Sequence, residues 1–405
     1  MREDWKYQPL GEITTSINGL WKGKKPPFVN VGVIRNANFT KEFTLNLSNI
    51  EYLDVEERQY SSRKLQKGDL IVEKSGGSEK QPVGRTILFD LDGEYSVSNF
   101  TSILRIKDKT FIIPTFLYKY LLYIYKEGYT KEMQNATTGI HNIIYDKFLS
   151  IPIPILSLTE QERIVALLDD QFAKIDALKA NAASQLQAAK DLFQSALKEM
   201  LTPKEGWEHY TINDVISDLR TGLNPRVHFK LNTPDADCYY ITVRELKGFT
   251  IEVDEKTDLV NKEAIVRINQ RSHLQIGDVL FSATGTIGNT ALVKEIPQNW
   301  NIKEGIYVMT PRKEKLNSKY FIYLLSSDFF LKSVRAKAEG TGVKSIAMKN
   351  LVKFPISFPS LPEQERIAAR LDAISEKVKA LQDNYDQTIT FCNDLKQSLL
   401  KSIFA

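Results

Sequence analysis

The stretch of sequence that decides the fold is residues 158–169, which read LTEQERIVALLD. It returns at residues 361–372 as LPEQERIAARLD, 203 residues later, with nine of twelve positions identical. Solenoid and propeller repeats have periods of roughly 20–50 residues, so a repeat this long indicates a duplicated domain. The 405-residue chain is therefore expected to contain two similar domains, each followed by the same helix.

The duplication extends outward from these two stretches. Residues 120–122 (YLL) are repeated at 323–325, and residues 138–140 (TGI) match residues 341–343 (TGV), again 203 residues later. The first copy has five extra residues between Gly76 and Gly84. Insertions of this kind belong in exposed loops, where binding specificity usually lies.

Composition limits the class of protein. The net charge is only +4, which allows nucleic-acid binding through local basic patches and does not demonstrate it. Cys238 and Cys392 have neither zinc spacing nor a disulfide framework, so two buried thiols in a reducing cytoplasm are expected. The N-terminus has no apolar signal core, and no apolar stretch is long enough to span a bilayer. A soluble cytoplasmic protein is the expectation.

Each copy is expected to begin with short strands rich in β-branched and aromatic residues. The expected strands are residues 70–72, 86–89 and 102–106 in the first copy and 279–281, 291–293 and 306–309 in the second. A helix is expected near residues 115–126 and near 318–338, followed by proline-rich extended segments at 151–154 and 354–359.

Each copy then ends in a predicted helix of about 40 residues, roughly 60 Å long. Thr159 is the expected N-cap of the first. Apolar positions follow heptads: Leu371, Val378, Tyr385, Cys392 and Leu399 with Ile374, Leu381, Thr388 and Leu395, and more weakly Leu168, Ile175, Ala182, Ala189 and Ala196 with Leu178 and Leu192. Because such long helices need a partner, we expect them to pair antiparallel with each other. The alternative is that each packs on its own domain.

Motifs for catalysis are missing from the sequence. Residues 224–226 read NPR and lack the second proline and the aromatic residue of an adenine-methyltransferase turn. Residues 340–345 resemble a phosphate-binding loop, but with the wrong spacing. A nuclease built on Asp69 and Glu73 stays open, although Asp69 and Asp278 both follow a glycine and are better explained as turn residues. The histidines share no metal-binding pattern: His141, His209, His228 and His273.

The chain resembles the specificity subunit of a type I restriction-modification enzyme over its whole length. The resemblance rests on the duplicated L-x-E-Q-E-R-I helix starts, on the T-G-x-x-x-I and P-x-P segments before the first helix, and on the opening W-x-x-x-x-L-G-E-I from Trp5 to Ile13. The second copy departs from this opening, with INDV at residues 212–215.

The resemblance implies an α+β fold. Two similar mixed α/β target-recognition domains would be separated by two long helices that form an antiparallel coiled coil, with pseudo-twofold symmetry. On this scheme residues 1–157 and 202–360 are the recognition domains, and residues 158–201 and 361–405 are the spacer helices.

The resemblance also implies the function. Each domain would read one half of a split target in double-stranded DNA, and the non-catalytic chain would recruit two methyltransferase (modification) subunits, with or without two restriction subunits. This chain would bind no cofactor and no metal, and S-adenosylmethionine, ATP and Mg²⁺ would belong to the partner subunits. Two alternatives are a stand-alone two-headed DNA-binding regulatory or architectural protein, and a nuclease or methyltransferase with an unrecognised motif.

Candidate site residues follow from residue type, because Lys, Arg, Asn, Gln, Ser and Thr supply most contacts to phosphates and base edges. In the first domain they are Lys22, Lys24, Lys25, Lys74, Ser75, Lys80, Gln81, Arg85, His141 and Asn142. In the second they are Arg220, Asn224, Arg226, Thr284, Thr286, Asn289 and Lys344. The helix starts supply candidate contacts to partner subunits: Glu160, Gln161, Arg163, Glu363, Gln364 and Arg366. For each residue the alternative is an ordinary solvated side chain.

Overall fold

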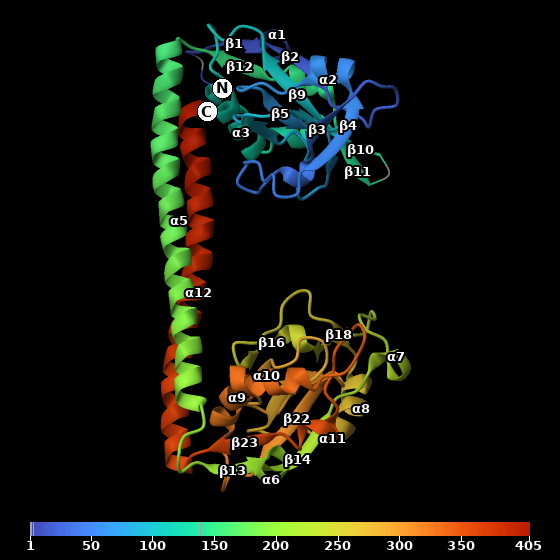
Figure 1. Cartoon of the computed structure of the whole chain (residues 1–405), viewed down its shortest axis with the longest axis vertical. Coiled ribbons are helices and arrows are strands. Elements are labelled where there is room, and N and C mark those ends of the chain that lie inside the picture. The colour runs from blue at the N-terminus through green and yellow to red at the C-terminus, as the bar shows by residue number, and fades with distance from the viewer. Residues whose placement is uncertain (1, 3, 138) are drawn as a thin grey trace. The chain divides into compact units, whose positions relative to one another are not determined.

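The computed structural model describes residue 2, residues 4–137 and residues 139–405, without the side chains of Thr137, Arg226 and Val227. The chain divides into two compact units (Figure 1). The first unit is Met1–Asn181 with Gln387–Ala405, and the second is Ala182–Asp386. Each unit therefore contains one mixed α/β domain together with part of each long helix.

The first unit is built around an antiparallel sheet of four strands in the order β2-β9-β5-β7. These strands are β2 (Thr14–Asn18), β9 (Thr101–Ile106), β5 (Leu70–Glu73) and β7 (Thr86–Leu88). A second sheet has the order β4-β3-β8: Glu51–Glu56, Phe28–Ile34 and Tyr95–Val97. In this sheet β3 is antiparallel to β4 and parallel to β8.

Smaller elements complete the first domain. The hairpin of β10 (Gln134–Thr137) and β11 (Ile140–Ile143) pairs with β6 (Ser75–Gly77). Strands β1 (Lys6–Pro9) and β12 (Pro152–Ile155) form a pair beside the start of the long helix. The helices are α1 (Leu10–Ile13), α2 (Glu57–Arg63), α3 (Pro114–Lys126) and α4 (Tyr145–Leu149), with 3-10 turns η1 (Asn36–Asn38) and η2 (Tyr129–Met133).

The second domain repeats this order. Its four-stranded sheet is β14-β22-β19-β20: Ile216–Thr221, Ile306–Pro311, Val279–Ser282 and Thr290–Leu292. Its three-stranded sheet is β18-β15-β21: Leu259–Val260, Cys238–Ile241 and Trp300–Ile302. Again the middle strand is antiparallel to one neighbour and parallel to the other. The duplication predicted from the sequence is thus present strand by strand.

Smaller elements complete the second domain, and some of them, such as the pair of β13 (Glu208–Thr211) and β23 (Pro355–Phe358), match elements of the first. A second strand pair is β16 (Leu246–Lys247) with β17 (Thr250–Ile251). The helices are α6 (Ile212–Val215), α7 (Pro225–His228), α8 (Lys262–Ser272), α9 (Ser318–Ser326), α10 (Asp328–Ala336) and α11 (Met348–Leu351), with the 3-10 turn η3 (Val243–Glu245).

The single helix expected near residues 318–338 was wrong, because the structure has two. The break falls at Ser327, which is extended and ends α9. Its hydroxyl oxygen accepts the backbone N–H of Phe330 at 3.4 Å and so caps α10. A serine favours a cap over a helix interior because it can satisfy an otherwise unpaired N–H.

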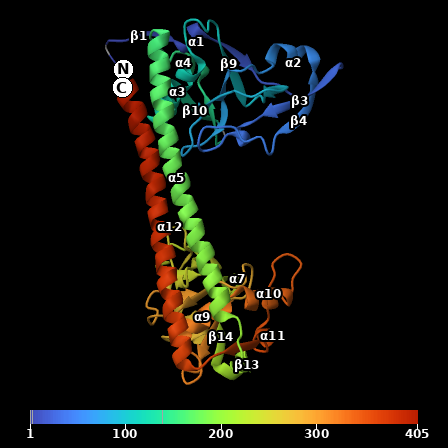
Figure 2. The ribbon, with the colours of Figure 1, turned by 60° about the vertical axis from the view of Figure 1, so that its left-hand side comes forward.

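The two long helices are α5 (Leu158–Leu201) and α12 (Leu361–Phe404). In each unit a part of α5 lies antiparallel against a part of α12 (Figures 1 and 2). In the first unit the Lys396 ammonium lies 2.6 Å from the Asp176 carboxylate, and in the second Lys190 donates to Gln382 at 3.0 Å. The predicted antiparallel pair is confirmed.

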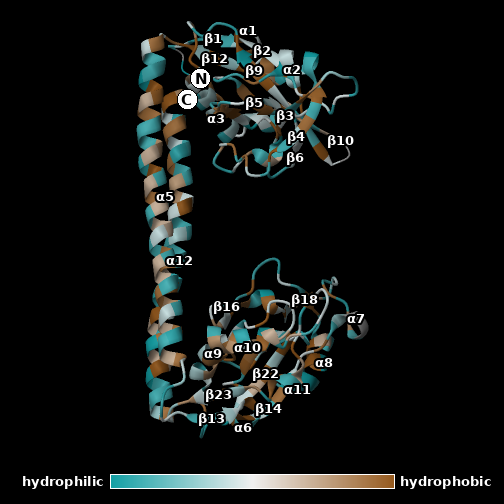
Figure 3. Cartoon of the chain, in the orientation of Figure 1, coloured by the Kyte–Doolittle hydropathy of each residue, from teal (hydrophilic) through white to brown (hydrophobic). Residues whose placement is uncertain are grey.

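The start of each long helix packs on its own domain, because Leu168 of α5 lies in the core of the first domain and Leu371 of α12 lies in that of the second. The two arrangements considered from the sequence therefore occur together. The end of each long helix packs on the domain of the other copy. In the first unit Phe404 at the end of α12 packs against Phe116, Tyr120 and Tyr123 of α3, with ring centroids 5.2–5.9 Å apart. In the second unit the ring centroid of Phe193 in α5 lies 6.2 Å from that of Tyr323 in α9. Each helix thus has one apolar side for its partner and its domain, and hydrophobic and polar colours alternate along it (Figure 3).

Three details of the helices differ from the expectation. Leu178 and Leu192 are 54% and 63% exposed, while Leu186 and Phe193 are buried. In a straight helix, residues seven positions apart are rotated by about 20° relative to each other. A strict seven-residue row therefore turns away from the partner helix along its length. The N-cap at Thr159 was also wrong: α5 begins at Leu158, and Ser157 Oγ accepts the Glu160 N–H at 3.3 Å.

Two further observations bear on the class of protein. Cys238 and Cys392 are buried free thiols, as expected. Among the described residues, the structure contains no helix that combines the length and apolarity needed to cross a bilayer.

Candidate nucleic-acid interface

In the first domain the β10–β11 hairpin brings distant candidate residues together. Asn142 lies opposite Ser75 in the ladder between β11 and β6, and His141 lies opposite Gly77. The Ile143 N–H donates to the Lys74 carbonyl at 2.8 Å, which extends the same ladder. Four predicted contacts from two segments of the sequence therefore form one continuous edge.

The inserted loop follows directly after β6. Lys80 and Gln81 are exposed on it, and the Gln81 N–H donates to Ser78 Oγ at 3.2 Å. Arg85, at the end of the loop, is only 9% exposed. Its guanidinium makes a two-point ion pair with the buried Glu73 carboxylate at 2.6 and 3.2 Å. Arg85 is thus occupied inside the domain and is not presented on the loop.

The basic segment after β2 lies on the surface. Lys22, Lys24 and Lys25 are all exposed. The backbone N–H groups of Lys24 and Lys25 donate to one carboxylate oxygen of Glu56, each at 3.2 Å. The hydrogen bond from the Lys24 N–H is the main reason why the pKa of Glu56 lies below its usual 4.5. Glu56 therefore shapes this segment and leaves the ammonium groups facing outward.

Sequence reasoning missed three residues around Lys74. The Lys74 ammonium donates to Asn18 Oδ1, the first of the three, at 2.8 Å. The other two are Tyr145 and Ser102, which lie near Asn18 with the Tyr145 hydroxyl 2.7 Å from Ser102 Oγ. Asn18 ends a strand just before the basic segment, which is a signal that could have been used. Ser102 and Tyr145 carried no such signal, because their contact joins residues 43 positions apart.

The second domain has the matching arrangement around residues 339–345. Thr284 forms an isolated antiparallel bridge with Ser345, and Glu339 forms another with the same residue. The Gly285 N–H donates to the Lys344 carbonyl at 2.9 Å. Thr284, Thr286 and Lys344 are exposed. The Thr284–Ser345 bridge corresponds to the Ser75–Asn142 pair of the first domain, so Lys344 occupies the position of His141.

Other candidates in the second domain are engaged internally. Arg220 is 9% exposed, and its guanidinium lies 2.9 Å from the fully buried Asp278 carboxylate. The Asn289 amide donates to two backbone carbonyls at 3.2 and 3.3 Å. Asn224 Nδ2 donates to Glu304 Oε1 at 2.7 Å. The side chain of Arg226 lies outside the described residues.

Asp69 and Asp278, the two carboxylates predicted as turn residues, immediately precede β5 and β19. Asp278 also accepts the Gln275 N–H at 2.8 Å, so it serves the turn that was predicted for it. Asp69 does the same for the Gln66 N–H at 2.7 Å and pairs with Arg105, also at 2.7 Å. These carboxylates are therefore turn and core residues in both domains.

The starts of the long helices divide into buried and exposed candidates. Gln161 and Gln364 are completely buried, and their amide groups bond to backbone atoms of their own domains. Glu160 and Arg163 form an exposed ion pair at 2.7 Å, and Glu363 and Arg366 repeat it at 2.7 Å. Only the charged residues of this motif can reach another protein.

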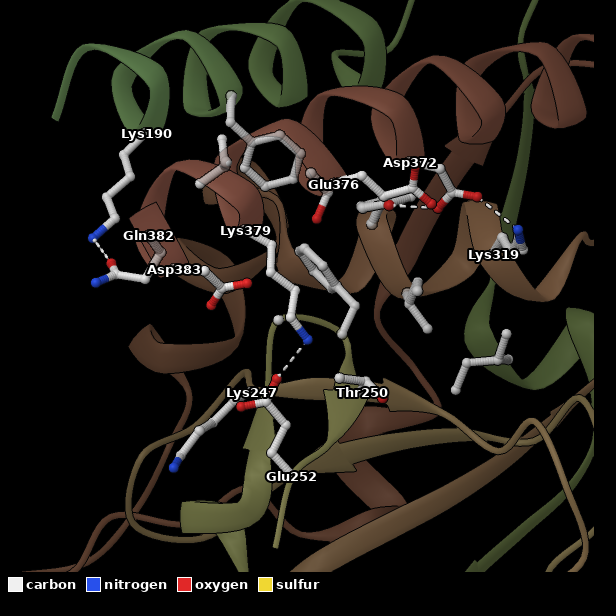
Figure 4. Close-up of a pocket in the computed structure, with 18 of the residues that line it drawn as sticks. Lys190, Lys247, Thr250, Glu252, Lys319, Asp372, Glu376, Lys379, Gln382 and Asp383 are labelled. Atoms are coloured by element: carbon white, nitrogen blue, oxygen red, sulfur yellow. Dashed lines mark hydrogen bonds and ion pairs between the residues drawn. The ribbon is translucent and has the colours of Figure 1, made fainter. Parts of the chain in front are cut away.

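A hollow of 660 Å³ lies in the second unit between the β16–β17 hairpin and the long helices (Figure 4). Both lysine and carboxylate side chains line it. Lys379 donates to Glu252 at 3.1 Å and Lys319 to Asp372 at 2.7 Å (Figure 4). These contacts fasten the domain to α12. None of the candidate DNA contacts lines this hollow, so it is separate from the loops described above.

The part of the chain that the structure describes contains no group of three or more His, Cys, Asp or Glu side chains arranged to hold a metal ion.

Comparison with known protein families decides the identity of these two domains. The model of the type I restriction modification DNA specificity domain matches the chain twice, at residues 2–188 and 204–390. The chain belongs to the type I restriction-modification specificity subunits. The two matches coincide with the two copies seen in the sequence and in the sheets.

Individual specificity subunits are similar along nearly the whole chain. The EcoKI specificity subunit of Escherichia coli strain K12 is 23% identical over 432 residues, covering 99% of this chain and 89% of that protein. The StySPI specificity subunit of Salmonella potsdam is 23% identical over 437 residues, with the same two coverages of 99% and 89%.

Solved structures show the same fold for specificity subunits. A chain from a structure described as the basis of complex assembly and conformational transition of the type I restriction-modification system has a TM-score of 0.72. It is 20% identical, covering 100% of this chain and 98% of that chain. The HsdS subunit from Thermoanaerobacter tengcongensis has a TM-score of 0.52 at 20% identity, covering 100% of this chain and 97% of that one.

Proposed function

We propose that this specificity subunit reads a DNA target in two separate halves, one with each domain, and has no catalytic activity of its own. One observation supports this most strongly. The two domains share their strand order, yet they place different side chains at equivalent positions of the paired segments. His141 and Lys344 follow this rule, as do the pairs Ser75–Asn142 and Thr284–Ser345. Two domains with the same fold but different side chains at equivalent positions suit a DNA target whose two halves differ in sequence.

The proposed readers are the candidates whose side chains are exposed or partly exposed. In the first domain these are Lys22, Lys24, Lys25, Lys74, Ser75, Lys80, Gln81, His141 and Asn142. In the second they are Thr284, Thr286 and Lys344. Asn224 is partly buried and donates to Glu304 at 2.7 Å. The donors and acceptors of the proposed readers suit phosphates and the edges of bases. Arg85, Arg220 and Asn289 support the loops from inside, because their donors are engaged within the domain.

We assign residues 1–157 and 202–360 to target recognition and residues 158–201 and 361–405 to a spacer. The spacer assignment is supported by the antiparallel contacts between α5 and α12. A paired helix is stiffer than a flexible linker, so its length should set the number of base pairs between the two half-sites.

We propose two modification subunits as partners, with or without two restriction subunits. The duplicated exposed ion pairs, Glu160–Arg163 and Glu363–Arg366, offer two equivalent contact points. S-adenosylmethionine would bind to the modification subunits, and ATP and Mg²⁺ to the restriction subunits. Such a complex acts on cellular DNA and therefore works in the cytoplasm.

Reconstitution tests this proposal. The purified chain alone should transfer no methyl group to DNA, whereas the chain with its modification subunits should methylate adenines within a two-part sequence. Native mass spectrometry should show one specificity subunit with two modification subunits. Glu160→Lys combined with Arg163→Glu keeps the ion pair but reverses its charges, so it should weaken the binding of one modification subunit. Methyl transfer by the isolated chain, or a complex with a single modification subunit, would contradict the proposal.

A further inference from the structure

A polar cluster surrounds Lys74 where β5 leaves the main sheet of the first domain. The Lys74 ammonium donates to Asn18 Oδ1 at 2.8 Å. The backbone of Lys74 is held on both sides, because its N–H donates to the Phe100 carbonyl and its carbonyl accepts the Ile143 N–H, each at 2.8 Å. The base of this side chain is therefore fixed by strand pairing, and its tip is fixed by a single amide.

Three hydroxyl groups lie next to this contact. Asn18 is paired with Ser102 across β2 and β9. The Tyr145 hydroxyl lies 2.7 Å from Ser102 Oγ and 2.6 Å from Ser16 Oγ. Ser16 and Asn18 are two residues apart on one strand, so their side chains share a face of the sheet. Lys74 thus stands at the rim of a patch of donors and acceptors.

The equivalent described positions of the second domain do not form such a patch. The residue after β19, which corresponds to Lys74, is Ala283, and it is completely buried. Thr221 takes the position of Asn18, and its hydroxyl donates to the Glu304 carbonyl at 2.6 Å. Tyr307 takes the position of Ser102, and its hydroxyl donates to the Ile346 carbonyl at 2.8 Å. At these three described positions the second domain has neither the cation nor its amide partner.

Lys74 differs from the lysines of the surface segments in its burial, which affects the pKa of its ammonium. Its side chain is partly buried, and this burial lowers the pKa of its ammonium below the usual 10.5. An ammonium has three N–H donors, and Asn18 accepts from one of them. The remaining two can serve a neighbouring pair of acceptors, which guanine presents in the major groove as O6 and N7. A freely moving surface lysine suits a phosphate better, since a phosphate does not need a fixed donor.

We infer that Lys74 reads a guanine in the half-site of the first domain, that Asn18 is its positioning residue, and that the second half-site has no lysine reader at the equivalent place. This inference rests on the proposed function, because it needs each domain to read its own half-site. It adds the identity of one reader and of the base that it recognises.

The test uses the full chain assembled with its modification subunits. The target of the wild-type complex is first mapped by methylation sequencing, and every base pair of both halves is then replaced in turn in duplex substrates. A wild-type complex that methylates a two-part sequence upholds the proposed function whatever Lys74 does. Lys74→Met should then accept other bases at one guanine of a single half-site. Discrimination there should fall about 5- to 150-fold, the range for a good bidentate contact.

Two further variants separate base reading from structure. Asn18→Asp keeps a partner for the ammonium but binds it by charge, so it should weaken preference at the same guanine. Lys67→Met removes a cation of the same domain that is paired with Asp92 at 2.9 Å on the surface, and it should change no preference. The unaltered second half-site reports that the variants are folded.

Two results would overturn the inference. If Lys74→Met lowered binding equally for all sequences and reduced its salt dependence, Lys74 would be a phosphate contact. If Lys74→Met left every base preference intact, Lys74 would not contact the target at all.

Discussion

Gln364 makes in the second unit the same set of hydrogen bonds that Gln161 makes in the first. The amide oxygen of Gln161 accepts the Ile113 N–H at 2.9 Å, and that of Gln364 accepts the Asn317 N–H at 2.9 Å. The amide nitrogen of each glutamine donates to two backbone carbonyls at 2.9–3.1 Å. Ile113 and Asn317 are the N-cap residues of α3 and α9. The repeated glutamine therefore fastens each long helix to the main helix of its domain.

Replacing this glutamine should destabilise its unit. Gln161→Ala leaves a buried N–H and two carbonyls without partners, which costs about 1–3 kcal/mol per unsatisfied group. The midpoint of urea unfolding should fall accordingly, and Gln364→Ala should behave in the same way. Thr159→Ala is the control, because Thr159 is exposed two residues earlier on the same helix. Equal midpoints for Gln161→Ala and Thr159→Ala would show that these bonds contribute nothing.

The buried arginines should matter for folding and not for the DNA sequence that is read. Arg220→Ala leaves the Asp278 carboxylate in the core without its cation, a change that costs about 3–5 kcal/mol. Arg267→Ala removes an exposed ion pair with Glu263 and should cost under about 0.5 kcal/mol. Denaturant unfolding measures the difference. A changed base preference with unchanged stability in Arg220→Ala would contradict this assignment.

Acidification should release the basic segment of the first domain. The pKa of Glu56 is held below its usual 4.5, chiefly by the Lys24 N–H. A carboxyl group with a lowered folded pKa contributes stability above its unfolded pKa and loses it as the pH falls through the folded value. Amide protection of Lys24 and Lys25 should therefore be constant above about pH 4.5 and decline below it. Glu56→Gln should lack this pH dependence. Hydrogen exchange that is identical in the two proteins at every pH would refute the role of Glu56.

The sequence predicted the large features because they rest on periodicity and repetition. A comparison of the chain with itself was enough to predict where the two long helices start, at residues 158 and 361. The same comparison predicted the duplicated strands. The roles of Arg85 and Arg220 could not be predicted from residue type. Arg220 meets Asp278 across 58 residues, and only the folded sheet brings them together. The buried role of Gln161 could not be predicted for the same reason. Its polar side chain is typical of a surface residue, and its backbone partners are known only from the fold.

The length of the helix pair should set the spacing of the two half-sites. Inserting four residues at a middle position of both α5 and α12 adds about 6 Å to the pair and keeps its apolar face nearly in phase. At about 3.4 Å per base pair, the gap should lengthen by one or two base pairs while both half-sites stay the same. Inserting two residues in each helix rotates the apolar face by about 200° and should prevent assembly. Methylation mapping of the four-residue variant with the original spacing would exclude the helices as the spacer.

The central claim is that each domain reads one half of the target independently. Its most direct test is methylation sequencing of DNA from cells that contain the modification subunits and a chimaera of this chain. In the chimaera, residues 1–157 are replaced by the matching domain of a specificity subunit with a different target. We expect that one half-site changes to that of the donor protein, while the other half-site and the spacing stay the same. A target in which both halves change together, or in which neither changes, would contradict it.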